Sequence, residues 1–272
     1  MVAVRWSLTS HLLGRREEFE AATQHPFLLA AAEGRLSKDD LGRWLSNDRL
    51  YIHSYIKAAG KMLGSLDLPQ QVPEREAYET QLVDWLIEAL TAVRREERFF
   101  IDVADRYGLS IDLGTQMATV ARENSGLHDS KLPGLVMIEG IFANLAPPAM
   151  VSAVDLPPNS SLPWLEAAVT FWGTEKCYLD AWTWARNKQI QGANASRDAD
   201  GGALRKEFIP NWSSPEFRAF VDKLGVLIDS AVDELVKGSG NEEEAIKAVT
   251  ERIDPKWISL LAAEAAFWPD IE

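Results

Sequence analysis

Three carboxylates stand among apolar and aromatic residues, where a purely structural helix seldom carries an acid. Glu264 lies within "LLAAEAAFW", with four apolar residues on each side. Glu175 follows the largely apolar run "VTFWGT". Asp48 shares a helical face with Tyr51 and Tyr55. An unpaired carboxylate is costly to bury, so we expect each acid to be hydrogen-bonded, paired or shifted in pKa.

Two interpretations of these acids remain open from the residues alone. In the first, each acid caps a helix, pairs with an arginine or points to solvent. In the second, the three acids converge on one site, and neighbouring rings such as Trp172 and Phe267 form its walls. Aromatic walls with a few convergent carboxylates are typical of a pocket for a flat, polar ring.

The only cysteine of the chain, Cys177, lies two residues beyond Glu175. This spacing places it roughly 200° away around a helix. A reactive thiol needs a basic or helix N-terminal setting, and the only basic near neighbour in sequence is Lys176. Inert packing is therefore favoured over catalysis. A single cysteine also excludes an internal disulfide and suits a reducing compartment.

Metal and cofactor chemistry find little support in the sequence. The four histidines are scattered and form neither an i, i+4 pair nor a compact set with glutamates: His11, His25, His53 and His128. The chain has no phosphate-binding glycine loop, no G-x-S-x-G and no dinucleotide-binding fingerprint. We therefore expect neither a metal nor an organic cofactor.

The composition indicates a globular protein with an acidic surface. Hydrophobic residues make up 46% of the chain, and the formal net charge is −13. A nucleic-acid footprint needs clustered lysine and arginine, and "RREER" at 94–98 instead alternates its signs, as a solvated helix face does. The N-terminal "MVAVRWSLTSHLLGRREEFE" has no apolar segment of signal-peptide or membrane-spanning length. We expect a cytoplasmic protein with no nucleic-acid or membrane partner.

Helical periodicity dominates the chain, and no series of alternating strands is evident. The pattern predicts helices over about 8–23, 26–33, 38–63, 74–107, 203–210, 214–237, 242–252 and 255–268. A further long helix is expected to end at about 188, with Ser160 or Ser161 as its N-terminal cap. Residues 109–160 favour two short helices with loops, and 191–202 a mobile loop. No internal repeat or shift in composition marks a boundary, so we expect one all-α domain over residues 1–272.

Several segments, in order along the chain, resemble the TenA family, the heme-oxygenase-like helical proteins that include thiaminase II. The first is "QHPFLLAAAEGRLSKDDLGRWLSNDRLYIHSYI" at 24–56. The next two, "REERFFIDVADRYGL" (95–109) and "FWGTEKCYLDAW" (171–182), resemble the branch in which a glutamate replaces the usual active-site cysteine. The segments "IPNWSSPEF" (209–217) and "EAAFW" (264–268) also match. The resemblance implies a single-domain heme-oxygenase-like helical bundle.

The resemblance also implies a function, an aminopyrimidine aminohydrolase of thiamin pyrimidine salvage. Such an enzyme hydrolyses an aminomethyl-pyrimidine without metal, here through the paired glutamates Glu175 and Glu264 as catalytic residues. Asp48 matches the aspartate that hydrogen-bonds the aminopyrimidine edge. The expected substrate-binding residues are Asp48, Tyr51, Tyr55, Trp172 and Phe267. The expected partner is a small-molecule aminopyrimidine, and a homo-oligomer, dimer or tetramer, is left open.

The residue types suit this reaction independently of the resemblance. A carboxylate can bind the amino group and ring nitrogen of an aminopyrimidine, and tyrosine or tryptophan can stack on its face. Replacing an amine by hydroxide needs one group to activate water and another to protonate the departing nitrogen. Two carboxylates in different surroundings can divide these roles.

Two other functions stay open. Members of the family usually carry a pocket tyrosine on the helix before the catalytic segment, and residues 109–160 contain none; Phe142 lacks the hydroxyl. A non-catalytic pyrimidine-binding protein is one alternative that fits this difference. A PqqC-like oxidase on the same scaffold is the other, although such chemistry depends on well-placed histidines and the chain has few.

Overall fold

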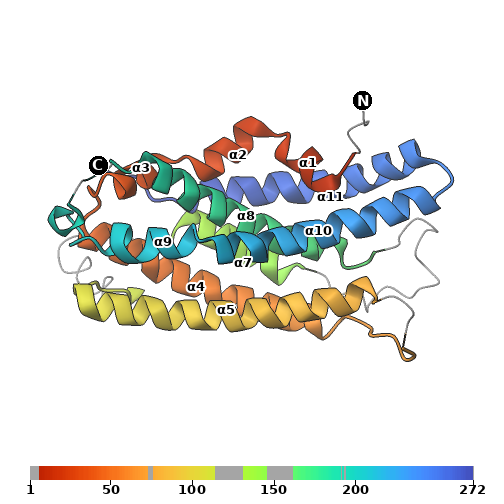
Figure 1. Ribbon diagram of the computed structural model, residues 1–272, viewed down its shortest axis with the longest axis horizontal. Coiled ribbons are helices and arrows are strands. Elements are labelled where there is room, and N and C mark those ends of the chain that lie inside the picture. Colours follow the sequence, from red (N-terminus) through yellow and green to blue (C-terminus); the bar gives the residue numbers. More distant parts are fainter. Residues whose placement is uncertain are drawn as a thin grey trace.

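The computed structural model describes residues 6–72, 76–113, 131–145, 162–190, 192 and 194–271. Within these ranges the chain forms an elongated bundle whose long helices run along one common direction, with no strand (Figure 1). The prediction of an all-α fold is therefore confirmed. No helix in the described ranges is both long enough and apolar enough to cross a membrane. The assignment to a single domain stays a prediction.

Helix α4 (Lys38–Leu63) carries three of the predicted site residues and begins where the sequence indicates. The Ser37 hydroxyl oxygen accepts a hydrogen bond from the backbone N–H of Asp40 at 3.1 Å, which satisfies one of the free donors of the first turn. The apolar face of α4 is buried from Leu41 to Met62. The same face therefore carries core residues and, near its middle, the site.

Helix α5 (Tyr78–Tyr107) lies alongside α4 and begins a few residues later than predicted (Figure 1). It ends at Gly108 as predicted, where φ is 65°, a left-handed conformation that glycine adopts without steric cost. The buried Glu97 of α5 accepts a hydrogen bond from His53 Nε2 of α4 at 2.7 Å and pairs with Arg94. The contact with His53 helps to fix how α5 is rotated against α4.

Helix α8 (Leu165–Lys188) runs through the middle of the bundle and packs against α2, α3, α9, α10 and α11 (Figure 1). Nearly all of its first half is buried. Trp164 occupies its N-cap position and makes no side-chain capping hydrogen bond. The predicted serine cap at Ser160 or Ser161 is therefore wrong for this helix start, and both serines lie outside the described residues.

The N-terminal helix predicted over 8–23 is divided into two. Helices α1 (Leu8–Leu13) and α2 (Arg16–Thr23) are separated at Gly14 and Arg15. Glycine is a poor residue for a helix interior, and here the chain changes direction at that point. Both short helices pack on α11 (Figure 1).

The C-terminal region shows the opposite difference, because α11 (Glu242–Ala265) is one helix where two were predicted. Pro255 lies inside it and removes one backbone hydrogen bond. On either side of the proline, Ile253 and Trp257 are fully buried, and the Trp257 indole donates to the Leu12 carbonyl at 2.9 Å. Tertiary packing thus outweighs the local cost of the proline.

The remaining elements are short or connect these helices: α3 (Pro26–Ala32), α7 (Pro133–Ala143), η2 (Ala195–Arg197), the π-helical turn η3 (Leu204–Phe208), α9 (Ile209–Trp212) and α10 (Pro215–Gly238). Of the two short helices expected within 109–160, α7 is observed, and the rest of that prediction falls largely outside the described residues. The prediction of a mobile loop over 191–202 is wrong for its second half. There Asp198 forms a buried ion pair with Arg205, and Asp200 accepts hydrogen bonds from two backbone N–H groups.

Aromatic side chains fill the core next to the site. The Trp44 ring stacks on Trp268 with centroids 5.7 Å apart and meets the edge of Trp182 at 5.4 Å. The ring centroid of Trp182 in turn lies 4.5 Å from that of Trp212. This cluster joins α4, α8 and α9 to the end of the chain beyond α11, so it holds the elements of the site against one another.

Helix α7 meets the C-terminal end of α11 at Gly134. The Gly134 backbone N–H donates to the Ala266 carbonyl at 3.0 Å. A Cβ atom built at this glycine would lie 2.3 Å from the Phe267 backbone nitrogen and 2.4 Å from the Ala263 carbonyl oxygen. Because these are backbone atoms, no side-chain rotation can relieve the overlap. Gly134 therefore sets the position of the last turn of α11, which carries Glu264.

Gly134→Ala should destabilise the protein by about 1–3 kcal/mol, because α7 and α11 must separate to admit one methyl group. Gly140→Ala is the matched control on the same helix, since nothing lies within 4 Å of a Cβ there. It should be neutral or stabilising by up to about 1 kcal/mol. Urea unfolding of the two variants measures the difference, and equal midpoints would contradict the close approach.

Candidate functional site

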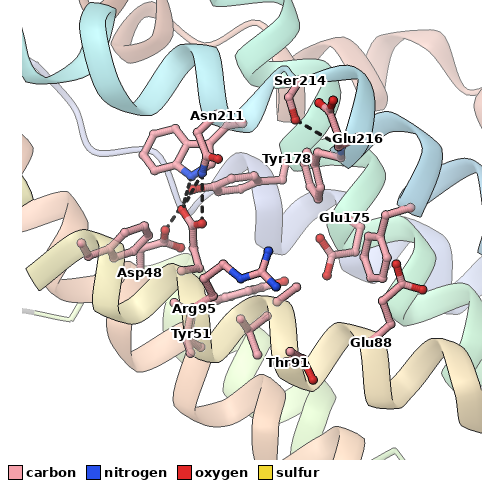
Figure 2. A pocket seen from close by; sticks show the side chains of 18 residues that line it. Asp48, Tyr51, Glu88, Thr91, Arg95, Glu175, Tyr178, Asn211, Ser214 and Glu216 are labelled. Carbon is pink, nitrogen blue, oxygen red and sulfur yellow. Dashed lines mark hydrogen bonds between the residues drawn. The ribbon is translucent and has the colours of Figure 1, made fainter. Parts of the chain in front are cut away.

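A pocket of about 430 Å³ lies among α4, α5, α8, α9 and the start of α10 (Figure 2). Its charged lining consists of five acids and one arginine: Asp48, Glu88, Glu96, Glu175, Glu216 and Arg95. Rings of Tyr51, Tyr178 and Trp212 form part of its wall. This size and this mixture of rings with a few polar groups are typical of a site for a small organic molecule.

Asp48 projects from α4 into the pocket and is only 3% exposed. The Tyr178 hydroxyl of α8 donates a hydrogen bond to Asp48 Oδ2 at 3.1 Å (Figure 2). Burial raises the pKa of Asp48 to about 8; the Tyr178 hydrogen bond opposes the shift, and the charges of Glu96 and Glu175 add to it. Near neutral pH this carboxyl is largely protonated, so it can donate one hydrogen bond and accept another.

Glu175 lies on α8 one turn before Tyr178 and lines the same pocket (Figure 2). Burial is the main cause that raises the pKa of Glu175 to about 7, and the charge of Glu96 adds to it. The nearby Tyr55 hydroxyl opposes the shift, although it makes no hydrogen bond of ordinary geometry within the described part of the chain. A carboxyl that titrates near neutral pH can serve as a general acid or base.

Glu264 lies on the last turn of α11, is 5% exposed and does not line the pocket. Its Oε1 atom has no hydrogen-bond partner among the residues that the structure describes. Burial, together with the charges of Asp48 and Glu175, raises the pKa of Glu264 well above its usual range. Burial raises the pKa of Tyr51, and the charge of Glu264 adds to this shift. Glu264 thus shares the electrostatic environment of the site without reaching the pocket surface.

Glu96 is a pocket residue that the sequence analysis missed. Its Oε1 accepts a hydrogen bond from the Trp212 indole N–H at 2.5 Å, and its Oε2 accepts one from Asn211 Nδ2 at 3.1 Å (Figure 2). Burial raises the pKa of Glu96, and both hydrogen bonds oppose the shift. The interpretation of "RREER" as a solvated face is wrong at Glu96, which is partly buried, and at Glu97, which is buried. The signal for Glu96 was its spacing, three residues after Val93 and four before Phe100.

The predicted aromatic residues lie at different depths. Tyr51 lines the pocket, and its ring centroid is 6.2 Å from that of Tyr55 and 6.0 Å from that of Phe267. Tyr55 and Phe267 are buried behind the lining and support it. Trp172 instead stacks on Trp257 of α11 at 5.5 Å and does not line the pocket.

Of the seven predicted site residues, Asp48, Tyr51 and Glu175 are brought together at the pocket surface. Their roles in binding and catalysis stay predictions. Cys177, on the same helix as Glu175, is 1% exposed, and burial raises the pKa of its thiol well above the usual range. A thiol in this setting is protonated and unreactive at neutral pH. The observed register therefore agrees with a packing role for the cysteine.

Several solved structures share this fold. A TenA homologue from Pyrococcus furiosus is 19% identical with a TM-score of 0.61, and the alignment covers 96% of this chain and 97% of that one. A TenA family transcription regulator from Silicibacter sp. TM1040 is 12% identical with a TM-score of 0.62, covering 96% and 93%. A TenA homologue from P. horikoshii OT3 is 13% identical with a TM-score of 0.59, covering 97% of each chain. The fold is therefore the heme-oxygenase-like helical fold of TenA proteins.

The similarity of the sequence to known proteins is low. No protein-family profile matches the chain. A curated protein from Fusarium pseudograminearum (strain CS3096), called a probable transcription factor, is 23% identical over 268 residues. The alignment covers 87% of this chain and 48% of that protein, so the chain spans about half the length of the curated relative it matches.

Asp48→Asn should change how thermal stability depends on pH. Free aspartic acid titrates near pH 4, whereas folding raises the pKa of Asp48 to about 8. Between these values the unfolded chain has lost this proton and the folded chain has kept it, so rising pH favours unfolding. Asparagine cannot titrate, so the melting temperature of the variant relative to the wild type should rise by a few degrees from pH 4 to pH 8. A constant difference across this range would contradict the assigned environment of Asp48.

Proposed function

We propose that the protein is a metal-free aminopyrimidine aminohydrolase that acts on an aminomethyl-pyrimidine of thiamin pyrimidine salvage. The observation that carries this proposal is the convergence of Asp48 and Glu175 on one pocket beside the Tyr51 ring. The likeness to TenA folds supports it at the level of the scaffold. Neither the volume nor the lining of the pocket suits a large substrate.

In the proposed complex, Asp48 holds the aminopyrimidine edge. Its protonated oxygen donates to a ring nitrogen, while the other oxygen accepts from the exocyclic amino group. The Tyr178 hydroxyl, bonded to Oδ2, fixes the carboxyl plane and is therefore a positioning residue. The Tyr51 ring provides a face for stacking.

The proposed reaction exchanges an amine for a hydroxyl. The oxygen of water bonds to the methylene carbon while the carbon–nitrogen bond breaks, its electron pair leaving on nitrogen. Glu175, which titrates near 7, accepts a proton from the water. Glu264, whose pKa is also raised, lies behind the pocket lining and, by way of the Tyr51 hydroxyl, keeps the departing nitrogen protonated until the bond breaks. The products are ammonia and a hydroxymethyl-pyrimidine.

A pyrimidine-binding protein without catalysis is the second candidate. Phe142 packs 5.8 Å from Tyr51, in the neighbourhood where the family resemblance leads us to expect another tyrosine, and it offers no hydroxyl. This candidate keeps the same pocket and loses only the chemistry, so binding without turnover would favour it. Because the net charge is −13, we propose no nucleic-acid partner, whatever the role of the two relatives named for transcription.

Glu175→Gln should abolish most release of ammonia from an aminomethyl-pyrimidine, because glutamine cannot transfer a proton. The expected fall in kcat is about 10²- to 10⁴-fold. Cys177→Ser is the matched control two residues away and should retain activity, since the thiol is buried and protonated. An absence of turnover in the wild type across several analogues would overturn the proposed function. Loss of activity in the cysteine variant alone would instead place this chain in the cysteine-dependent class.

Glu264→Gln should also lower turnover by about 10²- to 10⁴-fold while the melting temperature holds or rises. The reason is that the carboxyl is buried with one oxygen unsatisfied, so a neutral side chain of the same shape costs the fold little. Melting temperature and turnover are measured on the same preparation. A fall in stability with activity that tracks the folded fraction would make Glu264 structural, and full turnover would end its catalytic assignment.

A further inference from the structure

Glu96, which is partly buried, differs from the other acids of the site in how its carboxylate is held. Trp212 Nε1 and Asn211 Nδ2 each donate to a different oxygen, so α9 fixes the plane of a side chain that belongs to α5. Neither donor can accept a proton from the carboxyl, so both bonds favour its ionised form. Asp48, by contrast, receives one hydrogen bond, from Tyr178.

The bonded carboxylate keeps acceptor capacity that faces the pocket. A carboxylate has about four lone-pair positions, and the α9 donors occupy only part of them. Glu96 lines the pocket together with Asp48 and Glu175 and is close enough to affect the pKa of both.

The charges around the pocket favour a cation. Five acids line it against one arginine, Arg95, which lies on α5 one residue before Glu96 (Figure 2). Arg95 is exposed, and Glu88 at the pocket rim is exposed and paired with Lys223 at 3.0 Å. Among the acids, Glu96 therefore combines partial burial, a fixed orientation and a hydrogen-bonding pattern that favours its ionised form.

Resting on the proposed function, we propose that Glu96 is the specificity residue of this pocket. Its carboxylate accepts a hydrogen bond from the protonated amine of an aminomethyl-pyrimidine and so selects this cation over neutral pyrimidines. The hydroxymethyl product carries no charge and loses this interaction. Glu96 therefore makes the pocket bind the substrate more tightly than the product, and Trp212 and Asn211 are its positioning residues.

Calorimetric titration of an aminomethyl-pyrimidine and its hydroxymethyl analogue tests this selection. All chains carry Glu175→Gln, so that the amine is not consumed. With Glu96 intact, the amine should bind about tenfold or more tightly than the alcohol, the usual effect of a hydrogen bond to a charged group. Glu96→Gln should remove most of this ratio while alcohol affinity changes by less than about threefold.

Glu88→Gln is the matched control, because it removes the same formal charge from an exposed acid of the rim. It should change the ratio by less than about twofold, since exposed charges are screened. If both variants reduced the amine-to-alcohol affinity ratio equally, the preference would come from the overall negative charge of the pocket, and the role of Glu96 would be overturned. An unchanged ratio in Glu96→Gln would overturn it as well. Absence of binding of either pyrimidine would overturn the proposed function together with this inference.

A second variant keeps the test independent of folding. Trp212→Phe retains a ring against Phe208, 4.7 Å away in the wild type, and removes the N–H that holds Glu96. If Glu96→Gln does not fold by circular dichroism, Trp212→Phe should still lower the amine-to-alcohol ratio severalfold. A folded Trp212→Phe with the full ratio would then contradict the proposal.

Discussion

Desolvation of several carboxylates inside one aromatic shell is the constraint on which the rest of the structure depends. Asp48, Glu96, Glu175 and Glu264 come from four different helices, and burial raises the pKa of each. The charge of Glu96 raises the pKa of Asp48 and Glu175, and the charges of Asp48 and Glu175 raise that of Glu264, so the protonation of these acids is linked. Holding such groups together requires rigid surroundings, which the rings around Trp44 and Trp182 provide.

The helices are arranged so that each acid is controlled from another element. Tyr178 of α8 acts on Asp48 of α4, and Trp212 of α9 acts on Glu96 of α5. The neighbouring Glu97 faces α4 instead and contacts His53, so successive residues of α5 serve the pocket and the scaffold. A shift of one helix would therefore alter both the packing and the protonation of the site.

The sequence predicts the class of fold and part of the site, because both depend on periodicity. Asp48 and Tyr51 are three residues apart on one helix, so their shared orientation follows from local geometry. Glu96 was missed since the alternating charges around it resemble a solvent face, and only α9 reveals its partners. The same limit explains Pro255, whose local signal ends a helix that the buried Trp257 extends. Gly134 depends entirely on a distant backbone and has no local signature.

The hydrogen bond between Trp212 and Glu96 also has an optical consequence. The indole lines the pocket, and its N–H is bound to a carboxylate, so its emission depends on the charge and solvation at that oxygen. Trp182 lies 4.5 Å away and Trp44 5.7 Å away, close enough for excitation to pass among the three rings. Occupation of the pocket is thereby coupled to the intrinsic fluorescence of the chain, which makes the protein a sensor of its own ligand without any attached dye.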